Sequence, residues 1–558
     1  MKKIINGLLA VGGLMLAVSC ADYNETYNFT AEGDPSYTIP YADLAPVKSY
    51  INRDKYPNMS LGATLKVADF NKQELAHAAA ITNFNTVAFG STLMSGAIVS
   101  EKGIMNFLSM MDLLDHMQEI NGEVYGSPIV ANANQADKWI KYLTSPIEIQ
   151  VDPVHDMTVD YTTMDEWTGT SKKGKPVIVK DFDENGNALK IPTKSKVYIA
   201  EGFDLDMKGT YTVTLWAQVT KDETVSFTFA DSLLNSGVDN KGNVITKKFD
   251  IKAGGWKKLR IEDLKPAEGA TYGYMMMEGN LNSVVYLQKV EVEHAPDNHR
   301  PQTDQEKNDT IRYALNAWCD GLMKYNAGRI KSFDLIDKAL DTNTLEGTDV
   351  YDLKHAGADQ IFWQDILGSE NYAPEVSKIA QEAFVKYGGN ADELKFFICE
   401  SGLDETKKMN SLKYWMKIWE QKGAKIDGIN AELNLTFSED AATQDANFKK
   451  YQAFLQSLKE TGKMIRLSNF DIKYQDADGA PVTAADITEA QRQKLADYNA
   501  QVLKEYMKTI PNEKQAGICK TNMVDSNDPV GLWAISSTKD WVRTATYKAF
   551  CDVLSGKE

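Results

Sequence analysis

Two carboxylates in the second half of the chain could act as an acid and a base. Asp337 follows residues 332–336, an apolar stretch that predicts a buried strand, and Glu432 ends another such stretch. Barrel enzymes place working residues at the carboxyl ends of parallel strands. The alternative is a set of solvated or paired groups at an open barrel mouth, with Lys338 as the ion-pair partner of Asp337. We favour this alternative, because a relocated catalytic pair must also recover its spacing and separated pKa values.

Aromatic side chains are the other residues whose chemistry points to a ligand. Sugar rings present apolar C–H faces, which Trp and Tyr rings bury while polar neighbours bond the hydroxyl groups. Trp216 falls opposite the alternating apolar residues 211, 213 and 215, so it is exposed if those residues are core. For Trp216 we leave binding and packing open. For Tyr272 and Tyr274 we keep sugar binding as a hypothesis but favour packing beside neighbouring methionines.

Metal chemistry has little support in the sequence. The six histidines show no HxxxH or HExxH spacing, and the cysteines show no CxxC spacing. Four cysteines follow the N-terminal region and are expected to be free, buried thiols, although their disulfide state stays open: Cys319, Cys399, Cys519 and Cys551. One stretch alternates oxygen ligands in a way that would suit a structural calcium ion, although hairpin turns use the same residues: Asp181, Asp183, Asn185 and Asn187.

The elements that position these residues fall into two kinds. Residues 46–148 and 297–558 alternate strand-like and helix-like stretches, which is typical of a (β/α)8 barrel. Residues 149–296 alternate apolar and polar residues between turn signals, which is typical of an all-β sandwich. We therefore predict an α/β fold, a TIM barrel interrupted by a jelly-roll-like β-sandwich insertion.

The charge balance narrows the class of partner. The chain of 558 residues has 61 Lys and Arg against 78 Asp and Glu, a net charge of −17. Nucleic acids and anionic lipids bind clustered cations, so neither is expected as a primary partner. Since 10 Trp, 25 Tyr and 20 Phe can bury ample core, disorder is not expected either. A neutral polymer such as a polysaccharide remains open.

The N-terminus predicts export and a lipid anchor. Lys2 and Lys3 precede the apolar residues 4–18, which are too few to span a bilayer. Residues 17–20 (AVSC) resemble a bacterial lipobox, in which Cys20 is lipidated; a plain secretory signal is the alternative. Residues 21–45 then read as an acidic tether. We expect an outer-membrane lipoprotein that faces the cell exterior.

Eight short motifs occur along the two α/β segments in the order of one enzyme family. They are residues 61–63 (LGA), 83–87 (NFNTV), 126–130 (GSPIV) with Gln135 and Trp139, 333–340 (FDLIDKAL), 362–368 (FWQDILG), 395–400 (KFFICE), 423–429 (GAKIDGI) and 468–472 (SNFDI). Together they resemble glycoside hydrolase family 10, the retaining xylanases of barrel fold. Some members from gut Bacteroidetes carry a carbohydrate-binding sandwich after the third barrel strand, which the insertion resembles.

The resemblance also marks where this chain departs from the family. Retaining glycosidases use two carboxylates about 5–5.5 Å apart. The resemblance puts Lys338 at the acid/base position and Asn469 at the nucleophile position. An amide cannot form the glycosyl ester, and a Lys titrates far from the required range. The resemblance also puts Trp139 and Trp533 near sugar-contacting positions, so both could line a groove in the barrel mouth.

We therefore expect the fold of the family without its catalysis. The leading hypothesis is a surface lipoprotein that binds xylan or a related β-glycan for a glycan-uptake complex, with no cofactor. One alternative is an active endo-xylanase-like hydrolase in which Asp337 and Glu432 have taken over. Another makes the barrel a scaffold for protein contacts.

Overall fold

The computed structural model describes residues 41–230, 245–266, 270–357 and 360–557. The expected signal segment, Cys20 and most of the expected tether lie outside these residues, so the lipid anchor stays a prediction. Within the described ranges, no helix combines the length and the apolar character that crossing a bilayer requires.

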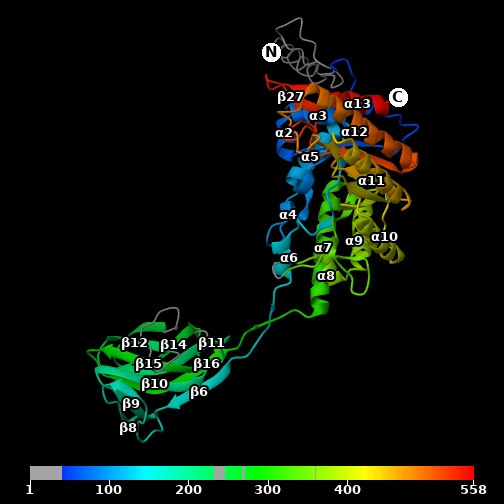
Figure 1. Ribbon diagram of the computed structural model, residues 1–558. Coiled ribbons are helices and arrows are strands. Elements are labelled where there is room, and N and C mark those ends of the chain that lie inside the picture. Colours follow the sequence, from blue (N-terminus) through cyan, green and yellow to red (C-terminus); the bar gives the residue numbers. More distant parts are fainter. Residues whose placement is uncertain (1–40, 231–244, 267–269, 358–359, 558) are drawn as a thin grey trace, which may run out of the picture. The chain divides into compact units, whose positions relative to one another are not determined.

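A curled sheet of parallel strands forms the centre of the first unit, as predicted for a (β/α)8 barrel (Figure 1). Its strands are β1 (Leu61–Thr64), β2 (Thr86–Ala88), β3 (Glu123–Tyr125), β4 (Val130–Ala131), β18 (Ser332–Asp337), β21 (Lys395–Ser401), β22 (Gly428–Glu432), β24 (Met464–Ser468) and β26 (Gln515–Lys520). They are hydrogen-bonded in the order β3-β2-β1-β26-β24-β22-β21-β18-β4. Most are short runs buried on both faces, which suits strands covered by helices.

The sheet closes on itself between the third and fourth barrel strands. β4 pairs with β18 in parallel, and Gly126, which follows β3, bridges to Phe333 of β18. Gly126 N donates to Ser332 O at 2.8 Å, and Ile129 N donates to Asp334 O at 2.9 Å. β3 and β4 thus act as one interrupted third strand, and eight strand positions complete the barrel.

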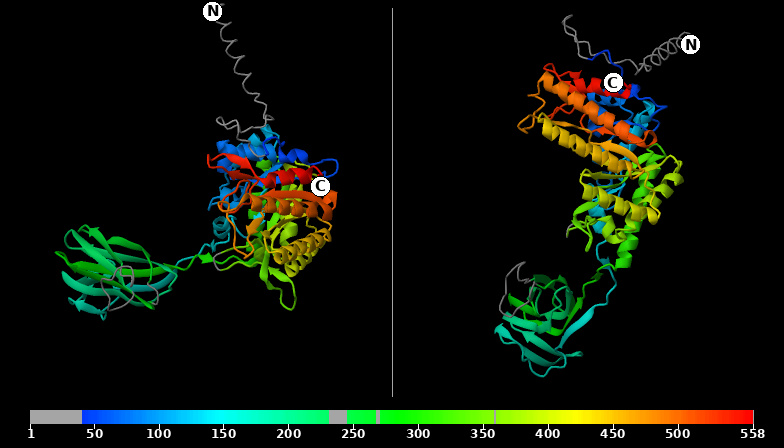
Figure 2. Two further views of the ribbon diagram at one scale, coloured as in Figure 1. Left: turned by 45° about the horizontal axis from the view of Figure 1, so that its top comes forward. Right: turned by 45° about the vertical axis from the view of Figure 1, so that its right-hand side comes forward.

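Helices cover the outside of this sheet (Figures 1 and 2). They are α2 (Val67–Lys72), α3 (Leu75–Asn83), α4 (Ser95–Ile98), α5 (Leu108–Glu119), α6 (Asp137–Leu143), α7 (Asp304–Asn326), α8 (Trp363–Leu367), α9 (Tyr372–Lys386), α10 (Thr406–Gln421), α11 (Ala441–Lys459), α12 (Glu489–Thr509) and α13 (Ala545–Leu554), with 3-10 turns η1 (Val47–Tyr50), η2 (Gly90–Leu93) and η3 (Asn512–Lys514). α7 shows why such stretches are helical: Thr303 caps it, and its buried residues Ile311, Leu315 and Leu322 recur at helical spacing.

Small strand pairs extend the barrel loops. They are β19 (Leu340–Thr344) with β20 (Tyr351–Leu353), β23 (Thr436–Ser438) with β25 (Lys473–Gln475), and β27 (Trp533–Ile535) with β28 (Trp541–Arg543). The four described cysteines are all free and buried.

The second unit is an antiparallel β-sandwich, again as predicted (Figure 2). Its strands are β6 (Val154–Asp160), β7 (Ser171–Lys173), β8 (Val177–Asp183), β9 (Gly186–Ile191), β10 (Lys194–Asp204), β11 (Thr210–Val219), β12 (Glu223–Ala230), β13 (Ile245–Ile251), β14 (Lys257–Leu264), β15 (Tyr272–Asn280) and β16 (Val285–Ala295). One sheet has the order β13-β12-β15-β10-β7, and the other the order β14-β11-β16-β9-β8, with β6 on β16. Tyr211, Val213 and Leu215 are fully buried between them, beside Met275 and Met277.

The insertion is longer at both ends than the expected residues 149–296. The contacts assign Ser145–Gln302 to the sandwich unit and the remaining described residues to the barrel unit. The added residues contain β5 (Ile147–Glu148) and β17 (His299–Arg300), which pair antiparallel. The chain therefore leaves and returns to the barrel at neighbouring points.

Candidate functional site

A polar cavity lies at the carboxyl ends of the barrel strands. Its volume is about 430 Å³, and three of the expected residues, Asp337, Glu432 and Asn469, line it. Hydroxyl and amide groups make up much of the remaining wall: Thr64, Ser91, Ser127, Asn134, Asn430, Ser468 and Thr521. The parallel strands bring these distant residues together, as a barrel requires.

Lys338 forms an ion pair with Glu432, and not with Asp337 as we expected. Lys338 Nζ lies 2.8 Å from Glu432 Oε1. Partial burial opposes the charge of Lys338, but the hydrogen bond to Glu432 and the nearby Asp337 carboxylate outweigh it and raise the pKa of Lys338. The ammonium therefore stays protonated at neutral pH, so Lys338 cannot serve as the base of an acid/base cycle.

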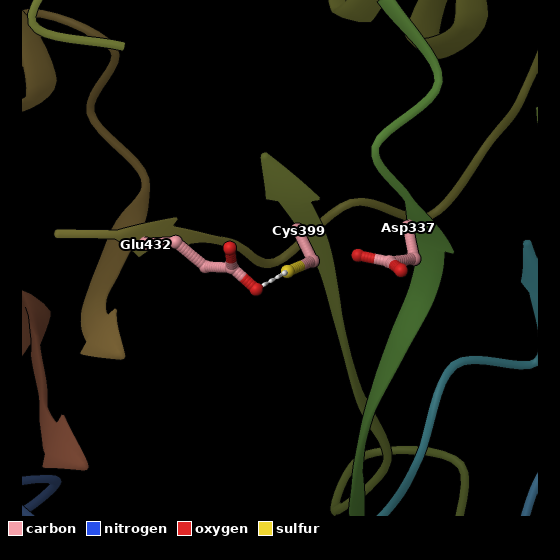
Figure 3. A group of neighbouring side chains, drawn as sticks. All are labelled: Asp337, Cys399 and Glu432. Atoms are coloured by element: carbon pink, nitrogen blue, oxygen red, sulfur yellow. Dashed lines mark hydrogen bonds between the residues drawn. The ribbon is translucent and has the colours of Figure 1, made fainter. Parts of the chain in front are cut away.

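Asp337, Cys399 and Glu432 gather beside this ion pair (Figure 3). Their donor atoms all lie within 4.8 Å of one another, an arrangement that could hold a metal ion that the sequence did not lead us to expect. Lys338 already supplies a positive charge at Glu432, so a cation would have to displace it. Burial raises the pKa of Asp337, although Lys338 and a hydrogen bond from Cys399 oppose the shift.

Asn469 turns its amide to the backbone of the residue that follows β22. Its Nδ2 donates to Leu433 O at 2.9 Å. Asn469 and Lys338 both adopt left-handed backbone conformations, with φ of 51° and 49°. Such positions cost conformational energy and concentrate at functional sites, and Asn tolerates them better than Lys. The two positions are thus set apart by their backbone as well as by their side chains.

The floor of the cavity is a buried polar network that the sequence analysis missed. Asp334 Oδ1 accepts a hydrogen bond from Tyr125 at 2.7 Å, and both its oxygens lie within 3.1 Å of Asn430 Nδ2. The Arg466 guanidinium stacks 3.8 Å from the Tyr125 ring centroid, and Nη1 donates to Asn430 Oδ1 at 3.2 Å. Burial raises the pKa of Asp334 to about 7, although Arg466 opposes the shift. The sequence does carry a sign of this network, because Asp334 is a charged residue inside the apolar stretch 332–336 that predicts a buried strand.

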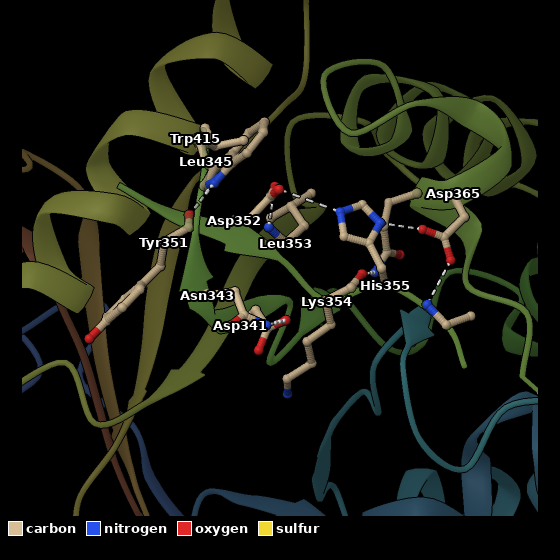
Figure 4. Close-up of polar contacts among 12 residues, drawn as sticks. Asp341, Asn343, Leu345, Tyr351, Asp352, Leu353, Lys354, His355, Asp365 and Trp415 are labelled. Atoms are coloured by element: carbon tan, nitrogen blue, oxygen red, sulfur yellow. Dashed lines mark hydrogen bonds and ion pairs between the residues drawn. The ribbon is translucent and has the colours of Figure 1, made fainter. Parts of the chain in front are cut away.

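Polar contacts surround the hairpin β19–β20 and the residues that follow it (Figure 4). Lys354 Nζ donates to Lys338 O at 2.7 Å. His355 lies between Asp365, at 2.6 Å from Nδ1, and Asp352, at 3.5 Å from Nε2. The hydrogen bond with Asp365 raises the pKa of His355. The contact of Lys354, directly after β20, holds the end of the hairpin β19–β20 at the backbone of Lys338.

Two tryptophans predicted to line the barrel groove are instead core residues. Trp139 is 4% exposed and Trp533 is 3% exposed, and neither lines the mouth cavity. Trp533 packs edge-on to Tyr547 at 5.4 Å, and the Trp139 indole lies against Gly103. The groove assignment for both residues is therefore wrong. Tyr125, which is buried at its floor, is the aromatic residue of the described chain that lines the mouth cavity.

The three aromatic residues named in the sandwich reach its surface, so the packing that we favoured for Tyr272 and Tyr274 is not what the structure shows. Trp216 is half-buried on the outer face of β11, opposite the core residues of that strand. Tyr272 is 49% exposed and Tyr274 is half-buried, both on the outer face of β15. Tyr198 of β10, which the sequence analysis missed, makes an edge contact with Tyr274 at 5.9 Å between centroids.

The calcium candidates are engaged in hydrogen bonds within the sandwich. Asp183 accepts from Trp256 Nε1 at 2.5 Å and from Gln288 Nε2 at 3.2 Å. Asn187 Oδ1 accepts from the backbone N of Asp181 at 2.9 Å. These contacts use oxygens that a calcium ion would need.

Comparison with known proteins gives a family for the second barrel segment. The family model described as Glycosyl hydrolase family 10 matches residues 294–550. No curated protein matches the sequence.

Solved structures of xylanases align with most of this chain at low identity. Xylanase B from Clostridium stercorarium F9 aligns with 10% identity and a TM-score of 0.50, over 91% of this chain and 100% of that one. Native xylanase 10C from Cellvibrio japonicus has 12% identity and a TM-score of 0.49, over 94% and 76%. The endo-1,4-β-xylanase XylE of Penicillium canescens has 12% identity and a TM-score of 0.48, over 92% and 98%.

Proposed function

The barrel is that of glycoside hydrolase family 10, and from this premise we propose that the protein binds a polysaccharide without hydrolysing it. The observation that carries the proposal is the ion pair between Lys338 Nζ and Glu432 Oε1 at 2.8 Å. A retaining mechanism needs a carboxylic acid and a carboxylate nucleophile at the barrel mouth. By the motif resemblance, the protonated amine of Lys338 stands at the first position and the amide of Asn469 at the second.

The proposed ligand is xylan or a related β-glycan. The neighbour with a TM-score of 0.50 is named a xylanase, which supports this class of polymer. The mouth cavity offers hydroxyl and amide groups, but its aromatic residue is buried at the floor. Aromatic stacking on the sugar is therefore expected in the sandwich, where Trp216, Tyr272 and Tyr274 reach the surface.

We also propose that the protein is a lipoprotein of the outer membrane that serves a glycan-uptake complex. Support comes from the basic and apolar N-terminal segment and from Cys20 at its end. Anchored display would compensate for weak sites, since several sites on one polymer raise the apparent affinity. Cys20→Ala should leave the protein unlipidated and shift it from the membrane fraction to the soluble fraction of its cells.

Calorimetry against soluble xylan, mannan and mixed-linkage β-glucan tests the main proposal when reducing sugar is measured in the same samples. We expect binding to one polymer and no release above a protein-free control. Release that scales with protein concentration would overturn the proposal. Absence of binding to every polymer would also count against it, and would favour a scaffold for protein contacts.

One observation favours an active hydrolase as the second candidate. Carboxylate oxygens of Asp337 and Glu432 lie within 4.8 Å of each other, and burial raises the pKa of Asp337, as a general acid requires. Asp337→Asn and Glu432→Gln separate the two functions. Under this alternative either substitution abolishes sugar release, whereas under the main proposal there is no release to lose.

A further inference from the structure

Four aromatic rings gather on the outer face of the six-stranded sheet of the sandwich. We call Phe182, Trp216, Trp256 and Tyr286 the aromatic patch. Phe182 lies 4.4 Å from Tyr286 and 5.7 Å from Trp256 between ring centroids. All four are half-buried, and none belongs to the apolar core that the described residues form between the two sheets.

The strand register brings Trp216 to the same patch. Gln218, two residues after Trp216 on β11, pairs with Tyr286 of β16. Trp256 comes directly before Lys257, which pairs with Ala217 of β11. Residues two apart on a strand share a face, so Trp216 and Gln218 lie beside the other three rings.

Two lysines flank Trp216 from the neighbouring strands. Lys258 of β14 and Lys289 of β16 are its direct cross-strand partners. Their Nζ atoms lie 5.0 Å and 5.8 Å from the centroid of the Trp216 ring. Lys289 also pairs with Glu291, whereas Lys258 has no acidic partner among the described residues. Lys289 also lies opposite Asp160 of β6, so Lys258 supplies the uncompensated positive charge beside the ring, in a protein whose net charge is −17.

Polar groups border the rings as well. Asp183 is held by Trp256 Nε1 at 2.5 Å and by Gln288 Nε2 at 3.2 Å, which fixes the indole of Trp256 at the surface. Gln218 is half-buried between the two tryptophans. Sugar-binding sites commonly combine aromatic rings, which stack on the C–H faces of the sugar, with amides, which hydrogen-bond its hydroxyl groups.

We propose that the aromatic patch binds a glycan chain that carries carboxylate groups, that is, one with uronic acid residues. This inference rests on the proposed glycan-binding function and names the site and the ligand class. A sugar stacked on Trp216 would place one of its own substituents next to the ammonium group of Lys258 or Lys289. A carboxylate at that position would replace water around an ammonium group that already lies over the indole. The acidic protein as a whole repels a polyanion, so the attraction depends mainly on Lys258 and is screened by salt.

The test compares the full chain and its variants on glucuronoxylan and on the same polymer after carboxyl reduction, by calorimetry at low and high salt. We expect the native chain to bind glucuronoxylan more tightly, with an advantage that shrinks as salt rises. Trp216→Ala should weaken binding to both polymers roughly tenfold. Lys258→Gln should weaken only binding to glucuronoxylan, by about threefold.

The matched control is Tyr313→Ala, which removes an exposed ring from α7 of the barrel and should leave binding unchanged. Trp216→Phe keeps a ring and should lose less than Trp216→Ala, and a thermal melt of each variant confirms folding. Equal affinity of the native chain for both polymers would overturn the acidic ligand class. Loss of binding in Tyr272→Ala with full binding in Trp216→Ala would overturn the site while the proposed function stands. Absence of binding to any glycan would overturn both.

Discussion

The interior of this barrel is unusual at the level of single residues. Layers of branched apolar side chains commonly fill such barrels. Here Asp334, Asn430 and Arg466 meet at the centre with Tyr125, and all four are buried. Burying a carboxylate and a guanidinium costs free energy unless hydrogen bonds and opposite charge compensate for lost hydration. The raised pKa of Asp334 indicates that the compensation is incomplete.

Asp334 should make stability depend on pH. Its pKa in the folded state is about 7, above the ordinary value of 3.8, so the folded state binds the proton more tightly than the unfolded state. The stabilising contribution of the proton is complete below about pH 4 and is lost as pH rises through 7. Between pH 5 and 7 the loss of this single proton lowers the free energy of unfolding by up to about 1.4 kcal/mol for each unit by which the pH rises.

Asp334→Asn should flatten this dependence, as measured by urea unfolding at several pH values between 5 and 8. Asp445→Asn, at an exposed position on α11, is the control and should keep the native slope. An Asp334→Asn variant with the native slope would contradict the assignment.

Single residues also show what sequence reasoning can and cannot supply. Alternation along one strand was enough to place Trp216 on the outer face of β11. Trp139 and Trp533 were misplaced because the family position alone does not say which way a loop or short helix turns a ring. The Lys338–Glu432 pair joins the residue after β18 to the last residue of β22, and its geometry depends on a strand arrangement that no local pattern encodes.

The predicted strands occur with small changes of boundary, because the apolar pattern of the sequence follows which residues are buried. Residues 332–336 were expected as a buried strand and form most of β18. β16 is the instructive exception. A bulge opposite Trp216 and Ala217 shifts its register, so the core receives Val285, Leu287, Val290 and Val292 instead of a uniform alternation. A bulge breaks the period of two that the sequence analysis assumed.

Barrel closure depends on a close approach between the third and fourth strands. A Cβ added to Gly126 would lie 2.2 Å from the Phe333 ring, which is buried. Gly126→Ala should therefore force the strands apart and lower the free energy of unfolding by about 2–3 kcal/mol. Denaturant unfolding followed by tryptophan fluorescence measures the loss. Gly357→Ala, where no atom lies within 4 Å of the added Cβ, should change little. Equal losses in both variants would show that packing at Gly126 is not the cause.

The start of α7 restores the barrel after the insertion. Thr303 accepts a hydrogen bond from Glu306 N at 3.2 Å, and Glu306 accepts one from Thr303 N at 2.9 Å. Thr303→Ala should cost about 1 kcal/mol of barrel stability, because a donor at the helix end loses its partner. Thr303→Ser keeps the hydroxyl group and should retain most of that stability in the same unfolding measurement. A Ser variant as unstable as the Ala variant would point to the methyl group instead of the cap.

At the scale of the whole molecule, the insertion is built as a separate folding unit. Its apolar core is formed by residues of the sandwich alone. Its two ends are joined by β5 and β17, and Ile149 N donates to Asn298 O at 2.6 Å. A domain with its own core and adjacent ends can fold independently of the chain that carries it.

The segment 145–302 should therefore fold alone and retain the glycan binding of the full chain. We expect one cooperative thermal transition for the isolated segment, and the same transition in the full chain beside a second one from the barrel. Calorimetry with the polymer that the full chain binds should give an affinity within about twofold, since the aromatic patch and the Tyr272 face both lie in this segment. A segment that folds but binds tenfold more weakly would move the binding site to the barrel mouth, where hydroxyl and amide groups would have to hold sugar without an exposed stacking ring.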